Sequence, residues 1–369
     1  MNNKLQWELE SFQHNSKSTQ SLKLSYDLFQ ESSLLDWQHR QVLSRGFKNM
    51  GNTCFINSTL QCLLYTPPLQ NIIHRCKKVF CTLCCFKRLF KSSTRIPDDF
   101  LKYLPRFSQS FSLGKQEDAH ELLRFLVERM ERNVVRQIFG GVLRSKVQCL
   151  NCHFESEIYE NFLDISLDLS DSDLERCLAN FCKNEFLDGM NLYFCAPCGV
   201  RTVACKQFII KSPPLILTLH LKRFTNEGKK DMTHVKFPEK LNFQPYLLMP
   251  EQSIYELYAV LVHMGYSSRS GHYYSYIKGP NNEWYIANDL SVLKVNLNKV
   301  LNDRSAYILF YKKSKVEDVD SDGADISLGK KKGRCLDFKE EKLREIKKMK
   351  IRGDGKENRR VKGCDGNKI

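Results

Sequence analysis

The pattern of apolar residues changes once, near residue 140, and this change limits the folds open to the chain. Before it, apolar residues recur at helical spacing over Phe55–Tyr65 and Gln116–Met130. Helices followed by strands predict an α+β fold rather than alternating βαβ units. The later, strand-like runs are bounded by turn residues and cover Gly141–Val147, Glu157–Leu169, Val203–Lys211, Leu215–Leu221, Tyr255–Met264, His272–Lys278, Trp284–Asn288 and Ala306–Tyr311.

Both ends of the chain are polar and are expected to lie outside this core. The whole chain carries 57 Lys/Arg and 42 Asp/Glu, a formal net charge of +15. Residues 329–369 alone hold 16 Lys/Arg against 7 Asp/Glu, which is nine of the fifteen net charges. This composition predicts a disordered, mostly basic tail over residues 314–369, with one amphipathic helix at 336–349. Residues 1–44 are Ser/Gln-rich and predict a polar extension, so the folded domain is expected at residues 45–313.

The chain contains 15 cysteines, and its first residues lack the apolar core of a secretion signal. In a reducing compartment, cysteines act as core residues, metal ligands or nucleophiles rather than as disulfides. No stretch approaches the roughly 18 consecutive apolar residues of a membrane-spanning helix. The composition therefore argues against secreted and membrane proteins and predicts an intracellular protein without a membrane partner.

Cys54 is the candidate nucleophile, because it lies between a Gly/Asn turn and the predicted helix at residues 55–65. A thiol at a helix N-terminus lies near free backbone N–H groups and the positive end of the helix dipole, and both lower its pKa. Asn49 and Asn52 supply amide donors in the same turn, of the kind that can bind an oxyanion. The alternative is that Cys54 is a buried structural cysteine, which is the more common role of an isolated cysteine.

A thiolate nucleophile also needs a general base, and the candidate among the nine histidines is His272. A Gly-Pro-Asn-Asn turn separates its strand from the next one, which ends at Asn288. The resulting hairpin would place Asn288 beside His272, where its side-chain oxygen could hold the imidazole in the required tautomer. The order Cys, His, Asn is that of papain-like cysteine proteases. A hydrogen-bonded strand histidine is the alternative for His272, and His120 is expected at the surface of its helix.

Two Cys-x-x-Cys pairs, Cys149 with Cys152 and Cys195 with Cys198, each offer two thiolates at the spacing of a zinc knuckle. Together they predict one structural zinc ion, and nothing in the sequence indicates an organic cofactor. The 42-residue spacer is longer than in a simple zinc ribbon, so four reduced cysteines without metal are the alternative. A second group, with His74 nearby, could also hold metal. It crowds into a short segment beside a helical pattern, so it is more simply explained as core or surface cysteines: Cys76, Cys81, Cys84 and Cys85.

Several segments resemble the motifs of the ubiquitin-specific proteases, in the order in which that family has them. Each is a moderate signal, but the set is specific and spans about residues 45–313. The segments are Gly51–Gln61 (GNTCFINSTLQ), similar to the cysteine box; Gln116–Leu122 (QEDAHEL), similar to the Gln-Asp box; Leu221–Phe224 (LKRF), similar to the palm motif; and Gly271–Tyr274 (GHYY) with Trp284–Asp289 (WYIAND), similar to the histidine box.

The resemblance implies a role for each residue of the candidate site. Cys54 would be the nucleophile, His272 the general base and Asn288 the third member of the triad. Asn49 matches the position that the family uses for the oxyanion, and Asp289 is a candidate auxiliary residue. The family commonly has Asp where Asn288 stands, which leaves open whether Asn288 or Asp289 mainly orients the base.

The resemblance also implies a papain-like fold of the ubiquitin-specific protease type. A helical thumb would cover about residues 45–140, zinc-binding fingers of β structure about 141–214, and a β-sheet palm about 215–313. The activity would be that of a thiol isopeptidase that hydrolyses the bond after the C-terminal glycine of ubiquitin. Its partners would be ubiquitin and ubiquitinated proteins, and the chain would act as a monomer.

Two further segments resemble the nuclear and nucleolar branch of the family, namely Gln137–Ser145 and Phe80–Cys84. Location is therefore expected to be the nucleus, with the nucleolus as a narrower choice and the cytoplasm as the alternative. The basic clusters at residues 330–334 and 359–360 have the character of nuclear import or RNA-contact segments. A tail that only adds solubility is the alternative.

Two other classes of function are open from the sequence. One is a catalytically dead ubiquitin-binding scaffold, which the presence of all three triad residues argues against. The other is a zinc-dependent nucleic-acid-binding protein, suggested by the Cys-x-x-Cys pairs and the basic charge. Against it, the excess charge lies largely in the tail and not around the cysteine pairs.

Overall fold

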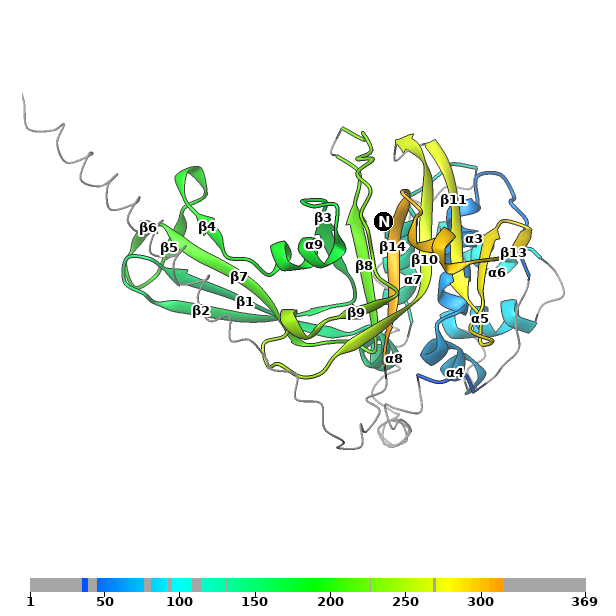
Figure 1. Cartoon of the computed structure of the whole chain (residues 1–369), viewed down its shortest axis with the longest axis horizontal. Coiled ribbons are helices and arrows are strands. Elements are labelled where there is room, and N and C mark those ends of the chain that lie inside the picture. Colours follow the sequence, from blue (N-terminus) through cyan, green and yellow to red (C-terminus); the bar gives the residue numbers. More distant parts are fainter. Residues whose placement is uncertain are drawn as a thin grey trace, which may run out of the picture. The chain divides into compact units, whose positions relative to one another are not determined.

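The computed structural model describes residues 35–38, 45–75, 81–91, 95–107, 114–130, 132–225, 227–267 and 270–314 (Figure 1). Over these residues the predicted α+β fold is confirmed, with helices first and sheets later. The expected tail at 314–369, with its helix at 336–349, lies outside the described residues except for Ser314. Within the described part of the chain, no helix is long and apolar enough to cross a membrane.

The helical part is organised around one helix that is buried along its whole length. All residues of α3 (Cys54–Leu64) are buried, because it lies between the other helices and strand β11. Asp118 caps the start of α7 by accepting a hydrogen bond from the backbone N–H of His120, which fixes where that helix begins. The remaining helices of this part are α4 (Pro67–Arg75), α5 (Thr82–Lys91), α6 (Asp98–Phe107), α7 (Ala119–Glu128) and α8 (Arg132–Ile138).

The larger sheet has eight strands in the described residues, in the order β13-β12-β11-β10-β14-β8-β3, with β9 paired to β10. All neighbouring pairs are antiparallel except β3 with β8. The strands are β3 (Ile165–Asp168), β8 (Ile216–Lys222), β9 (Lys240–Asn242), β10 (Ile254–Ser267), β11 (Ser270–Lys278), β12 (Trp284–Asn288), β13 (Ser291–Val295) and β14 (Ala306–Lys313).

A four-stranded sheet, β2-β1-β7-β4, forms a long ribbon, and the small pair β5-β6 lies near its far end (Figure 1). Both faces of β2 are largely exposed, as expected for a ribbon without a helix layer. The elements of this part and the short helices of the sheet region are β1 (Gly141–Cys149), β2 (Glu155–Phe162), β4 (Glu185–Leu187), β5 (Tyr193–Cys195), β6 (Val200–Thr202), β7 (Ala204–Ser212), α9 (Leu174–Phe181) and α10 (Leu297–Leu301).

The central strands of the larger sheet are buried on both faces and separate two apolar cores. Along β14, Ile308 and Phe310 face the core shared with the helices, whereas Leu309 and Tyr311 face the core on the other side. This alternation is the two-residue period of a strand with two covered faces. It fixes the register of the strands and therefore the position of the loops at their ends, where the candidate site lies.

Two expectations need correction. The predicted strand Glu157–Leu169 is two strands, because β2 pairs with β1 in the ribbon while β3 pairs with β8 in the larger sheet. Nor do all of the first 44 residues lie outside the core. Leu35 is buried against Leu215, and Trp37 packs its ring edge-on against Tyr65 with 6.2 Å between ring centroids.

Candidate active site and metal centre

Cys54 is the first residue of α3, directly after a loop with two left-handed residues. Gly51 has φ of 91° and Asn52 has φ of 57°, so the chain turns sharply before the helix begins. The Oδ1 atom of Asn49 holds this turn by accepting hydrogen bonds from the backbone N–H groups of Gly51 and Thr53, both at 3.1 Å. The thiol therefore lies where the free N–H groups of α3 begin, as the sequence predicted.

His272 and Asn288 come together as the predicted hairpin requires. Strands β11 and β12 pair antiparallel, and the Nε2 atom of His272 lies 2.7 Å from the Oδ1 atom of Asn288. This contact leaves Nδ1 of His272 for Cys54. A hydrogen bond to the Cys54 thiol, supported by Asn288, raises the pKa of His272 to about 9 despite partial burial.

The environment of Cys54 favours the thiolate. Burial acts to raise the pKa of the thiol, since Cys54 is only 2% exposed. Hydrogen bonds from His272, from the backbone of Tyr273 and from Gln116 outweigh this effect, so that the pKa of Cys54 is lowered. The lowered pKa of Cys54 and the raised pKa of His272 both favour a thiolate–imidazolium pair.

Asp289 ties the turn after β12 to the loop before Cys54. Its carboxylate accepts hydrogen bonds from Nδ2 of Asn49 at 3.1 Å and from Nδ2 of Asn57 at 2.8 Å. Its backbone oxygen accepts from the N–H of Phe47 at 2.8 Å. Gly46 is required beside this contact, because a Cβ atom there would lie 2.2 Å from the same oxygen. Nothing in the sequence pattern singled out Asn57, although it lies in the same motif as Cys54.

Asn52 lies in the same loop, and the expectation that its amide lies close to the sulfur stays a prediction. Its side-chain amide donates to the backbone oxygen of Gly114 at 2.8 Å, which ties the loop to the segment before α7. That segment also provides a contact to the thiol, from a residue for which the sequence pattern indicated no role. The Nε2 atom of Gln116 lies 3.7 Å from Sγ of Cys54, and its Oε1 accepts from the backbone N–H of Gly271 at 2.8 Å.

The expectation that His120 is a surface residue was wrong. Its side chain is only 12% exposed, and Nε2 lies 2.8 Å from Oδ2 of Asp164, just before β3. Its ring stacks on that of His220 on β8, with 3.7 Å between ring centroids. Burial and the neighbouring His120 lower the pKa of His220 to about 3, which keeps the stacked ring neutral. His120 therefore links the start of α7 to the sheet.

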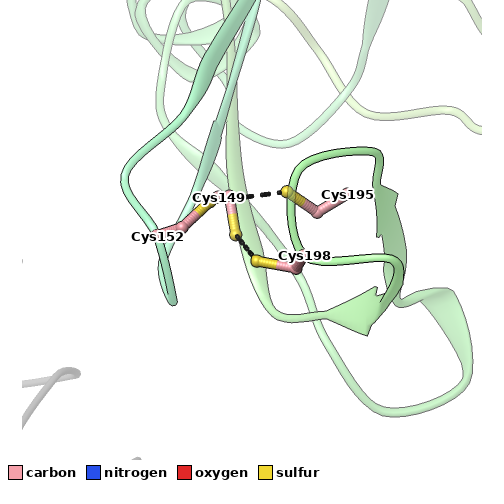
Figure 2. A group of neighbouring side chains, drawn as sticks. All are labelled: Cys149, Cys152, Cys195 and Cys198. Carbon is pink, nitrogen blue, oxygen red and sulfur yellow. Dashed lines mark hydrogen bonds between the residues drawn. The ribbon is translucent and has the colours of Figure 1, made fainter.

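The four cysteines of the two Cys-x-x-Cys pairs meet at the far end of the ribbon (Figure 2). The Sγ atoms of Cys149 and Cys198 are 3.9 Å apart, and those of Cys152 and Cys195 are 3.5 Å apart. All four sulfur atoms lie within 4.8 Å of one another. Four thiolates at this spacing fit one tetrahedral zinc ion, so the predicted ligand set is compatible with a structural zinc site.

In the described part of the chain, no other group of three or more metal-ligating side chains comes together in this way. Of the second cysteine group, Cys76 lies outside the described residues. The Sγ atoms of Cys81 and Cys84 are 3.2 Å apart at the start of α5, and the Arg88 guanidinium donates to Sγ of Cys85 at 3.4 Å. The expectation that these are ordinary core or surface cysteines stays a prediction.

Comparison with known proteins identifies the family. The model of the ubiquitin carboxyl-terminal hydrolase family matches residues 45–311, which is more than half of the chain. The chain belongs to this family. Among human relatives, ubiquitin carboxyl-terminal hydrolase 42 is 39% identical over 317 residues, which cover 77% of this chain and 24% of that protein. Ubiquitin carboxyl-terminal hydrolase 17-like protein 5 is 37% identical over 299 residues, covering 73% and 56%. The chain thus spans between a quarter and just over half the length of these relatives.

Solved structures with the same fold come from the SAGA deubiquitinating module Ubp8/Sgf11/Sus1/Sgf73. A chain of the module bound to monoubiquitin matches with a TM-score of 0.65 and 30% identity, over 74% of this chain and 70% of that one. A chain of the module bound to ubiquitin aldehyde matches with a TM-score of 0.66 and 28% identity, over 80% and 75%. The fold expected from the resemblance, with thumb, palm and zinc-binding fingers, is therefore confirmed for this family member.

Proposed function

We propose that this chain is a deubiquitinating thiol isopeptidase, which hydrolyses the bond after the C-terminal glycine of ubiquitin on protein substrates or ubiquitin chains. The observation that carries the proposal is the pairing of Cys54 with His272, whose other ring nitrogen contacts Asn288 at 2.7 Å. Family membership and the ubiquitin-bound state of the SAGA structures supply the substrate class.

In the proposed mechanism, the Cys54 thiolate attacks the carbonyl carbon of the terminal glycine and forms a tetrahedral intermediate. As the C–N bond breaks, the His272 imidazolium gives its proton to the leaving lysine amine, and a thioester remains on Cys54. Neutral His272 then takes a proton from water, whose oxygen attacks the thioester. Breaking of the C–S bond restores the thiolate–imidazolium pair and releases the ubiquitin C-terminal carboxylic acid, which loses its remaining proton to solvent.

We assign the oxyanion contact to Asn49 and to backbone N–H groups at the start of α3. The amide of Asn49 has two N–H bonds, and the one that donates to Asp289 holds the group in place while the other is available to a substrate oxygen. Asn288, which contacts the imidazole directly, is assigned the orienting role. Asp289 is assigned an auxiliary role through Asn49 and Asn57.

The zinc ion would act on structure alone, with Cys149, Cys152, Cys195 and Cys198 as its ligands. When bound, it supplies a cross-link between the β1 end of the ribbon and the β5-β6 pair. Four thiolates would complete the coordination of such an ion, so no position would be left for a substrate.

The remaining assignments follow from composition and from the neighbours. We propose that residues 45–313 form the catalytic domain and that residues 1–44 and 314–369 are extensions. Residues 329–369 are strongly basic, which supports nuclear location and contact with RNA. The SAGA neighbours are complexes with other subunits, whereas we propose that this chain acts on ubiquitin as a monomer.

A ubiquitin derivative with an electrophile at its C-terminus tests the proposed function. The chain should form a covalent adduct, and peptide mapping should place it on Cys54. Cys62→Ser is a matched control on the same helix: Cys62 is fully buried, and burial raises the pKa of its thiol, so this variant should still react. A folded chain that forms no adduct at Cys54 would support the dead-scaffold alternative instead. Probes based on other ubiquitin-like modifiers would show how narrow the specificity is.

A further inference from the structure

Gln116 contacts both elements that carry the proposed catalytic pair. It precedes α7, and its side-chain amide spans to the start of β11. Oε1 accepts a hydrogen bond from the backbone N–H of Gly271 at 2.8 Å, and Nε2 donates to the backbone oxygen of the same residue. Nε2 also lies 3.7 Å from Sγ of Cys54. The side-chain amide of Gln116 therefore contacts both Cys54, the proposed nucleophile, and Gly271, the residue directly before the proposed base.

The backbone that Gln116 holds is poorly fixed by the sheet itself. Strands β10 and β11 pair regularly up to Met264 with His272, after which the register shifts before the pair Ser267 with Ser270. Gly271 lies in this irregular stretch. The two hydrogen bonds with Gln116, one accepted and one donated by its amide, satisfy both backbone polar groups of Gly271 where the regular ladder ends.

The other side of Gly271 is closed by a buried side chain. Gly271 has φ of 156°, and a Cβ atom there would lie 2.5 Å from Nε2 of His263 and 2.6 Å from the backbone oxygen of Met264. His263 is 1% exposed and packs against Tyr273 with 4.6 Å between ring centroids. The backbone before His272 thus lies between the buried side chain of His263 and the amide of Gln116.

We propose that Gln116 is a positioning residue, whose amide holds the backbone of Gly271 so that His272 stays in contact with Cys54 and whose N–H group stabilises the thiolate. The proposal rests on the proposed function, because it concerns the same site. Glutamine suits this position since its amide presents one acceptor and one donor in the same plane. Glutamate, with the same shape, would present an acceptor to the oxygen of Gly271 and a negative charge to the thiolate.

The test compares Gln116→Ala and Gln116→Glu with wild type, using a ubiquitin–fluorophore substrate. We expect kcat to fall about 10- to 100-fold in Gln116→Ala, because a displaced catalytic group loses rate in this range, with KM little changed. Gln116→Glu should lose more. We call the contacts of the Gln116 amide with Gly271 and Cys54 the clamp. Glu117→Gln, in the same segment and outside the clamp, is the control that should keep wild-type kcat.

A second measurement follows the thiolate without ubiquitin. The rate at which iodoacetamide alkylates the Cys54 peptide, measured against pH, reports where the thiol loses its proton. The pH midpoint should move upward in Gln116→Ala. Asp289, after β12, acts electrostatically on His272, and Asp118, at the start of α7, acts on the neighbouring Tyr273; both are unchanged in the variant.

The outcomes separate this proposal from the proposed function. Wild-type protein that alkylates readily at Cys54 but never reacts with ubiquitin probes would overturn the function and leave the clamp to be judged by alkylation alone. The clamp is overturned if Gln116→Ala keeps both its kcat and its alkylation midpoint. It is also overturned if the loss of kcat only follows a loss of folded protein, which thermal unfolding of the same samples measures.

Discussion

The active site and the fingers both depend on cysteine, but they stabilise the sulfur in opposite ways. Cys54 is a single buried thiol, surrounded by N–H donors from His272, Tyr273 and Gln116, which lower its pKa. The four cysteines of the fingers instead face one another, with sulfur–sulfur distances of 3.5 and 3.9 Å. Hydrogen bonds leave a thiolate electron pair available for attack, whereas a metal ion occupies it.

The two sites also differ in how much the stability of the surrounding structure depends on their cysteines. The surroundings of Cys54 are held by packed elements, namely α3, β11 and β12, so the thiol itself can be replaced without removing their support. The β5-β6 pair is short and has little apolar core of its own. A zinc ion held by the four cysteines would therefore support this pair of strands.

The largest expected effect is the loss of hydrolysis when Cys54, at the active site, is replaced. Cys54→Ala should reduce hydrolysis of a ubiquitin–fluorophore more than about 10⁴-fold, because removing a nucleophile removes the covalent route. The thermal midpoint and the affinity for ubiquitin should stay near those of wild type. Turnover retained in this variant would show that another group performs the attack.

The second effect concerns the fingers, where replacing a cysteine should reduce stability rather than remove a reacting group. Cys195→Ser should bring bound zinc from one ion per chain to none and destabilise the fingers. Zinc binding supplies folding free energy on the order of 10 kcal/mol in small zinc peptides, and part of this should be lost here. Elemental analysis and thermal unfolding measure the two losses. Cys205→Ser, on β7 but outside the ligand set, is the control that should keep its zinc.

The next effect distinguishes the two residues that end β12. Asn288→Ala removes the partner of the His272 ring, so kcat should fall about 10- to 100-fold while the unfolding midpoint changes little. Asp289→Ala removes the acceptor for Asn49 and Asn57, so the free energy of unfolding should fall by about 1 to 2 kcal/mol as well. Equal profiles for the two variants would contradict the separate roles assigned to them.

These contrasts explain which parts of the site could be predicted from the sequence. The contact of His272 with Asn288 was predictable because both lie on one hairpin, and a short turn fixes the register in which its two strands pair. The zinc ligands were predictable because each Cys-x-x-Cys pair is a local turn. The start of α3 at Cys54 followed from turn residues and helical spacing.

The missed features all depend on contacts between elements far apart in the chain. His120 is half-buried because Asp164, just before β3, and His220, on β8, contact its ring, and the sequence of its own helix does not show them. Gln116 contacts Gly271 for the same reason. The split between β2 and β3 was missed since alternation of residues cannot tell one sheet from another.

The pH dependence should separate the two sites. The pKa of His272 is raised from its ordinary 6.5 to about 9 by Cys54, so the imidazolium that protonates the leaving amine is lost as pH rises through about 9. The values of kcat/KM should therefore fall above that pH. Initial rates on a ubiquitin–fluorophore, measured across this pH range, report the fall. Zinc, in contrast, should be lost on the acid side, as the cysteine thiolates become protonated.

The smallest effect on catalysis is expected from the basic tail. Truncation after residue 316 leaves β14, which ends at Lys313, and both cysteine sites intact, so kcat and KM on a ubiquitin–fluorophore should change less than about twofold. Location and polyanion binding should change instead, since residues 329–369 carry nine of the fifteen net charges. A fluorescent fusion should move from nucleus to cytoplasm on truncation. Retention of RNA by the full chain should fall steeply with added salt, because such binding depends on counterion release. A matched variant with Lys330, Lys331 and Lys332 changed to Gln tests whether charge alone is responsible. If location and RNA retention are the same in all three proteins, the tail adds solubility and does not set where the enzyme acts.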